Sequence, residues 1–215
     1  MCMCIDGSPI EDDSRSFRAD MFQISMMETL WHNQPTCLCS YLFPPCSAAY
    51  LRYLALDRDM TRYSCCQGYM DNVCFKSGKC NEKACPEFCL CVEVFLCLGP
   101  SISSTRMMVM DQYEIRPDPC DNRIIRLTNC LMMLSCICDL ASICVRELRH
   151  LSSTIHTLAN CVAYSTMGCM ASQVFREIDH RRQFRVEYGA YSDVDKLSPM
   201  LGHATYIHPE NTYPL

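Results

Sequence analysis

Cysteine is the residue type whose number and spacing in this chain point to chemistry. The 215 residues include 20 cysteines. Thiolate sulfur is a preferred ligand of zinc and copper(I), and irregular backbone can wrap around a tetrahedral ion. One stretch without helical or strand periodicity carries the candidate metal ligands, with zinc as the candidate metal: Cys65, Cys66, Cys74, Cys80, Cys85 and Cys89. Two facing Cys-x-x-Cys pairs are missing from this stretch, so packing as small apolar groups is an equal alternative.

The compartment decides what such thiols do. The N-terminal residues lack the basic and apolar segments of a secretory signal, so we expect a reducing environment and reduced thiols rather than a disulfide framework. A second group of cysteines lies in apolar segments, where we expect small core or lipid-facing side chains: Cys130, Cys136, Cys138, Cys144, Cys161 and Cys169.

Other functional classes have little support in the sequence. The chain has 19 basic and 24 acidic residues, a net charge of −5 that argues against a nucleic-acid partner. A Gly-rich phosphate loop, a Gly-x-Ser-x-Gly elbow and a His-Glu-x-x-His motif are all missing from the sequence. We therefore expect that the protein is not an enzyme.

Two apolar segments, residues 127–145 and 151–175, have helical periodicity and are each long enough to cross a bilayer core of ~30 Å. Residues 146–150 join them, which predicts an antiparallel helical hairpin. Asp139 would add about 2.5–3.5 kcal/mol to the cost of insertion. A membrane-spanning hairpin and a buried soluble hairpin are equal alternatives. In a membrane, Asp139 and His156 would form a polar site that faces a bundle interior or an ion path.

These elements predict a mainly α-helical, Cys-rich protein with an irregular thiol-rich loop and a C-terminal helical hairpin. We expect one domain over residues 31–175. Residues 1–30 are interpreted as a mobile acidic arm, and residues 176–215 as a mobile tail.

Several motifs within residues 31–173 occur together in one known family. They are Cys37-x-Cys39 with Phe43-Pro-Pro-Cys46, Arg62-Tyr-Ser-Cys65-Cys66-x-Gly68-Tyr69, Gly78-x-Cys80-x-Glu-x-x-Cys85-Pro86-Glu87-x-Cys89, Glu93-Val-Phe-x-Cys97 and Cys120-Asp-Asn-x-Ile-Ile125. Through these motifs the chain resembles the placenta-specific-8-like Cys-rich domain family, in particular its plant-type subgroup.

The resemblance implies a membrane-associated protein, often at the plasma membrane, with a role in divalent-metal handling or in growth and cell-number regulation. Zinc or cadmium tolerance is the metal-related function that it implies. The expected partners are membrane lipid and a divalent metal ion, with homo-oligomer formation left open. The alternative is a soluble, cytoplasmic, reduced zinc-binding interaction module.

Overall fold

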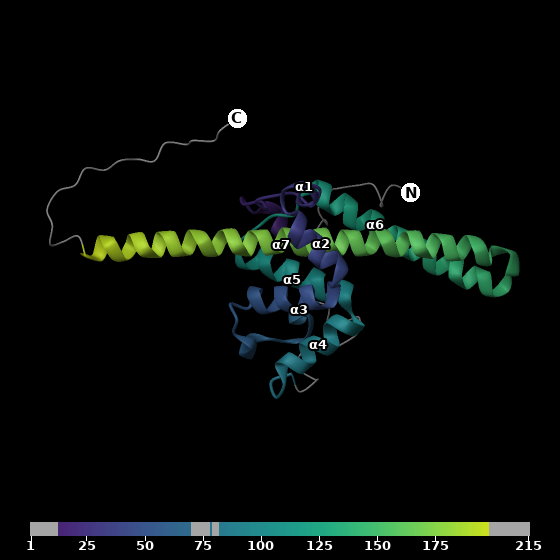
Figure 1. The fold of residues 1–215 in the computed structure, drawn as a ribbon, viewed down its shortest axis with the longest axis horizontal. Coiled ribbons are helices and arrows are strands. Elements are labelled where there is room, and N and C mark those ends of the chain that lie inside the picture. Colours follow the sequence, from purple (N-terminus) through teal and green to yellow (C-terminus); the bar gives the residue numbers. More distant parts are fainter. Residues whose placement is uncertain (1–12, 70–77, 79–81, 198–215) are drawn as a thin grey trace. The chain divides into compact units, whose positions relative to one another are not determined.

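The structure is a computed structural model that describes residues 13–69, 78 and 82–197, with side chains as far as residue 184. It is mainly α-helical, as the sequence predicts, and these residues contain no β-strand. Figure 1 shows the helices in chain order: α1 (Thr29–His32), α2 (Gln34–Leu42), α3 (Pro44–Ala55), α4 (Pro86–Leu96), α5 (Leu98–Gln112), α6 (Pro119–Cys144) and α7 (Arg149–Leu197).

Proline sets where several of these helices begin. Pro35, Pro44, Pro86 and Pro119 each lie in the first turn of a helix, where the missing N–H has no intrahelical partner to lose. Asp118 also caps α6 by accepting a hydrogen bond of 2.7 Å from the backbone N–H of Cys120. The local sequence therefore fixes helix starts more sharply than helix ends.

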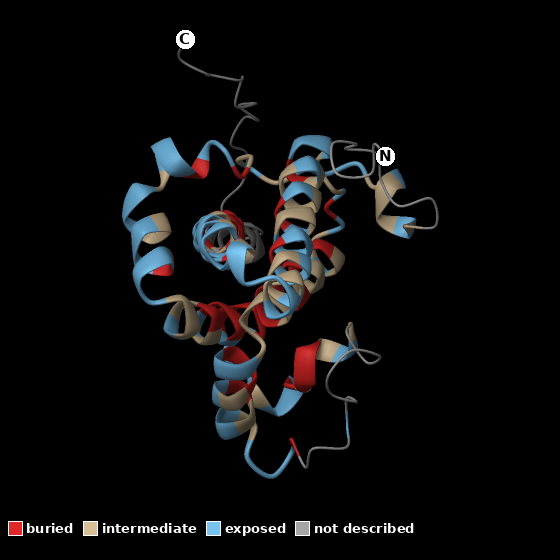
Figure 2. Cartoon of the chain, turned by 90° about the vertical axis from the view of Figure 1, so that its right-hand side faces the viewer, coloured by how far each residue is buried: buried red, intermediate tan, exposed pale blue. Residues whose placement is uncertain are grey.

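The apolar core lies where α3, α4 and α5 pack together and against the middle of α7. One cluster includes Leu90, Val94 and Ile102, and another includes Leu51, Val109 and Val174. Figure 2 shows the buried residues gathered on the inward faces of the helices, with exposed residues outside. Each fully buried Leu, Ile or Val contributes about 1.5–3 kcal/mol.

The predicted C-terminal hairpin is present, with bounds that differ from those expected. Helix α6 begins at Pro119 and ends at Cys144, and a 3-10 turn at Arg146–Leu148 leads into α7 (Figure 1). Helix α7 continues to Leu197, so residues 176–197 of the expected mobile tail are helical. The compact unit that contains the site ends at Ile178, and residues 179–197 are the described part of a second unit.

Residues 13–30 belong to the folded unit, although the sequence analysis places them in a mobile arm. Arg15 contacts Asp111 through Nε at 2.6 Å and Nη2 at 2.8 Å, and Arg18 Nη2 contacts the same carboxylate at 2.8 Å. Met26 and Thr29 are fully buried. The arm was expected because its composition is polar, but its arginines have a partner far along the chain.

Asp111 supplies a testable electrostatic contribution to folding. Burial alone would raise its pKa, but hydrogen bonds from Arg15, Tyr69 and Arg18 outweigh burial and hold the pKa well below its ordinary value. The stabilisation is therefore complete above the unfolded-state pKa of about 4 and is lost as the pH falls through the lower folded-state pKa.

We expect Asp111→Asn to lower the free energy of unfolding at neutral pH by about 1 kcal/mol, because the carboxylate is only partly buried. Urea unfolding as a function of pH measures this loss. The difference between wild type and variant should shrink below about pH 4. A difference that stays constant down to the acid limit would contradict the role given to this carboxylate.

Candidate metal centre

Three potential metal ligands converge in the buried part of the structure. The Sγ atoms of Cys65 and Cys66 and a carboxylate oxygen of Glu93 all lie within 4.8 Å of one another, and all three residues are buried. Cys65 and Cys66 begin the short turn Cys65–Gly68, whereas Glu93 comes from α4. The structure thus brings together two of the six predicted cysteines and adds a carboxylate that the sequence analysis did not select as a ligand.

The turn that carries the two thiols has an uncommon backbone conformation. Cys66 and Gln67 both have positive φ angles, of 45° and 50°. A non-glycine residue in this region carries a steric cost, so the surrounding contacts must hold it in place. The backbone N–H of Cys66 donates to Glu93 Oε2 at 2.8 Å, and that of Cys65 donates to Glu82 Oε2 at 3.0 Å. Two buried carboxylates therefore fix this turn.

Glu93 is itself held by a buried ion pair with Arg52 of α3. Arg52 Nη2 lies 3.1 Å from Glu93 Oε1, and both side chains are almost completely inaccessible to solvent. Arg52 also donates from Nε to Thr105 Oγ1 at 2.7 Å and from Nη2 to the carbonyl of Ser101 at 2.9 Å. The Tyr63 hydroxyl donates to Glu93 Oε2 at 2.8 Å. Glu93 therefore has a fixed position before any ion is considered.

The charges of this cluster suit a divalent ion. Burial is the larger cause and the negative charge of Glu93 the next, and together they raise the pKa of Cys66 to about 11 against the opposing charge of Arg52. Without metal, this thiol is protonated at neutral pH. The Arg52–Glu93 pair has no net charge, so a divalent ion bound by two thiolates would add none. A neutral buried centre avoids the large desolvation cost of an uncompensated charge.

The other predicted ligands lie elsewhere. Cys85 is exposed and Cys89 is half-buried, both on α4 or at its N-terminus. Cys74 and Cys80 lie outside the described residues. A pocket of about 210 Å³ adjoins the centre and is lined by Tyr63, Cys65, Glu82, Phe88, Cys89, Val92 and Glu93.

The predicted polar site of the hairpin is divided between two surfaces. Asp139 faces α7 and accepts a hydrogen bond from the hydroxyl of Ser152. His156 is exposed, and its ring lies 3.3 Å from the side-chain amide of Asn160 one turn further on. Of the two residues, Asp139 alone has the inward position that was expected.

Most described cysteines are reduced, as the sequence analysis expects. Fifteen carry reduced thiols, and several of those on the hairpin, including Cys136, Cys144 and Cys161, are exposed. Cys130 was expected to be a small apolar thiol, but it is disulfide-bonded. The hairpin cysteines do not join the candidate centre, which is built from a different part of the fold.

Known protein families, curated proteins and solved structures give no match to the chain. The resemblance to the placenta-specific-8-like family stays a prediction. What the fold and the site define is a helical, thiol-rich protein with a buried candidate metal centre; within the residues that the structure describes, one helix, α6, is long and apolar enough to cross a membrane.

The buried ion pair gives a stability prediction that does not depend on metal. Arg52→Met should lower the free energy of unfolding by about 3–5 kcal/mol, because it leaves the Glu93 carboxylate buried without its counterion. Denaturant unfolding followed by circular dichroism measures this loss.

The matched test is a double-mutant cycle. Arg52→Met combined with Glu93→Met should lose clearly less stability than the two single losses together, since no unpaired charge is left behind. Strictly additive losses would show that the two side chains do not stabilise each other.

Proposed function

We propose that this protein binds one divalent, thiophilic metal ion, of the zinc or cadmium type, through Cys65, Cys66 and Glu93. The observation that carries the proposal is the convergence of these three buried ligand atoms within 4.8 Å. Metal handling is the corresponding cellular role, and the resemblance noted in the sequence implies the same role. Growth regulation is implied by that resemblance alone.

The donor set favours soft or borderline ions over calcium and magnesium. Thiolates bind zinc-like ions well, whereas calcium and magnesium require oxygen ligands. Two protein sulfurs and one carboxylate leave one position of a tetrahedral ion for water. When bound, the ion would cross-link the Cys65–Gly68 turn to α4. This chain supplies the rigid part of the site, because Arg52 and Tyr63 hold Glu93 in place.

We expect Cys65→Ser and Cys66→Ser to reduce the bound zinc or cadmium well below one ion per chain, because each removes a thiolate ligand. Metal analysis of purified protein and the thiolate-to-cadmium charge-transfer absorbance both measure the loss. Cys144→Ser and Cys161→Ser are matched controls, since both cysteines are exposed on the hairpin. An equal loss of metal in all four variants would contradict ligation by the centre, and metal-free wild-type protein would refute the proposal.

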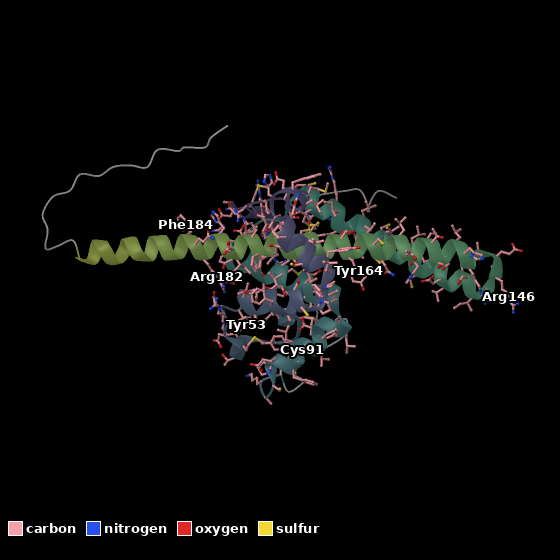
Figure 3. The ribbon with its side chains drawn as sticks, viewed as in Figure 1. Tyr53, Cys91, Arg146, Tyr164, Arg182 and Phe184 are labelled. Carbon is pink, nitrogen blue, oxygen red and sulfur yellow. The ribbon has the colours of Figure 1, made fainter. Side chains whose placement is uncertain are left out.

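A second proposed function is membrane attachment through the hairpin, and it depends on the distribution of polar residues. Helix α6 has a mean hydropathy of 1.7 over its most apolar 18-residue window, and 11% of that window is buried. Its outward residues Leu134, Ile137, Leu140 and Ile143 are between 47% and 75% exposed. Figure 3 shows this part of the hairpin extending away from α3–α5, with Arg146 at its far end.

The inner face of the hairpin is small and polar. Near the base of the hairpin, Gln173 of α7 donates a hydrogen bond of 2.7 Å to Asp121 of α6. Thr128 lies seven residues after Asp121, and Thr166 lies seven residues before Gln173. The hydroxyls of these two threonines are 2.9 Å apart. The next step of seven reaches Ser135 and Ala159, both buried. Polar residues inside and apolar residues outside are the reverse of a soluble hairpin and are typical of helices packed in lipid.

Helix α7 is less apolar than the sequence analysis implies when it treats the two segments of the hairpin as equal candidates for crossing a bilayer. Within the described residues it does not reach the apolarity of α6, so the two segments are not equivalent spans. Residues 151–175 nevertheless contain no Asp, Glu, Lys or Arg. The hydroxyls of Thr154 and Thr157 donate to backbone carbonyls one turn earlier, at 3.0 and 2.9 Å, and so need no water. These features support insertion of α7 only as the partner of α6.

Two neighbouring residues of α6 test membrane attachment. Leu140→Asp places a carboxylate on the apolar outer face and should oppose insertion by about 2.5–3.5 kcal/mol. Asp139→Leu removes a carboxylate from the inner face and should increase insertion. Carbonate extraction and flotation with lipid vesicles measure both changes. If wild type and Leu140→Asp were equally extractable and independent of lipid, the hairpin would be a soluble element and the membrane proposal would fail.

A further inference from the structure

Two of the cysteines selected from the sequence, Cys85 and Cys89, lie outside the three-ligand centre but on the same helix as Glu93. Along α4 and its two caps, potential ligands recur every four residues: Cys85, Cys89, Glu93 and Cys97. Residues four apart are neighbours on a helix and are separated by ~6 Å along its axis. The series changes from exposed Cys85 through half-buried Cys89 to buried Glu93. It therefore leads from the surface towards the centre.

A cavity lies along the same route. The pocket of about 210 Å³ is lined by Cys89 together with Cys65 and Glu93, two of the three ligands of the centre. Phe88, which also lines it, is 65% exposed, whereas Glu82 at its wall is 3% exposed. The pocket thus has one side near solvent and one side at the buried ligands. A metal ion needs such a route, because every residue of the centre is buried.

We propose that Cys85 and Cys89 form an entry path along which a divalent ion passes, by stepwise ligand exchange, from solvent to Cys65, Cys66 and Glu93. This inference rests on the proposed metal-binding function. Cys91, which is labelled in Figure 3, lies on the same helix and is exposed, but residues two apart point to different sides of a helix, so Cys91 does not share the face of Cys89. The path is therefore specific to one face of α4.

Each step of this path exchanges protons and ligands without oxidation or reduction. The Cys89 thiol releases a proton to water as its sulfur bonds to the ion. When the ion moves on, the Cys65 and Cys66 thiols release their protons as their bonds to the metal form, and the Cys89 thiolate takes up a proton as its bond breaks. The net reaction binds one divalent ion and releases two protons to solvent.

The experiment is stopped-flow loading of the full-length, detergent-solubilised protein with cadmium, followed by thiolate-to-cadmium absorbance. Cys89→Ser should load about tenfold more slowly and release cadmium to a chelator more slowly by the same factor, because a path changes both rates and not the equilibrium. Its stoichiometry should stay at one ion per chain. Cys85→Ser should show a smaller change, and Cys91→Ser should load as wild type does.

The outcomes separate the path from the metal centre. Wild-type protein that binds no cadmium would refute both proposals. If Cys89→Ser bound one cadmium ion per chain and loaded it at the wild-type rate, the path alone would be overturned. If Cys89→Ser bound less than one ion per chain, Cys89 would be a ligand of the centre, and the path would also be overturned. Cys89→Ala, with its fold checked by circular dichroism, repeats the test with a substitution that adds no polar group to the half-buried site.

Discussion

The buried ion pair between Arg52 and Glu93 is the interaction on which the rest of this structure depends. A guanidinium and a carboxylate removed from water need close hydrogen-bond partners, and most are present here, although Nη1 of Arg52 is buried without one among the described residues. Here Thr105 and the carbonyl of Ser101 accept from Arg52, whereas Tyr63 and the backbone of Cys66 donate to Glu93. One neutral pair therefore joins α3, α4 and α5 and also fixes the turn that carries the two thiols. The stability of the fold and the geometry of the candidate centre have the same origin.

A second buried network connects this core to the hairpin, where the distribution of polar residues is reversed. Arg106 of α5 donates to Asp121 of α6 at 2.9 Å, and Gln173 of α7 donates to the same carboxylate oxygen. Helix α5 thus contacts Arg52, the ion-pair partner of Glu93, through Ser101 and Thr105, and it contacts the base of the hairpin through Arg106. In the core, apolar side chains face inward as in soluble proteins, whereas along the hairpin small polar residues do so. The two parts suit different surroundings, and a protein that binds metal at a membrane surface would need both.

Features of the fold and of the candidate centre that depend on neighbouring residues could be predicted from the sequence, whereas contacts between residues far apart in the chain could not. Helical periodicity and proline predict the helices and the hairpin, and the adjacency of Cys65 and Cys66 marks the thiols. Periodicity also places Ser135, Asp139 and Ser142 on one face of α6, but it does not tell which face is inside. Glu93 was missed as a ligand because a lone carboxylate in the apolar middle of α4 resembles any other glutamate, although its position four residues after Cys89 was an available signal. Contacts such as Arg15 with Asp111, 96 residues apart, have no local signature in the sequence.

Two thiolates and one carboxylate of this chain are proposed to bind one divalent ion. X-ray absorption of the zinc-loaded, full-length protein tests this proposal most directly, because Zn–S bonds of about 2.3 Å and Zn–O bonds of about 2.0–2.2 Å are resolved from each other. We expect two sulfur ligands with the remaining ligands oxygen or nitrogen, and one fewer sulfur around the zinc that remains bound to Cys66→Ser. A zinc shell without sulfur, or one that Cys66→Ser leaves unchanged, would contradict the proposal.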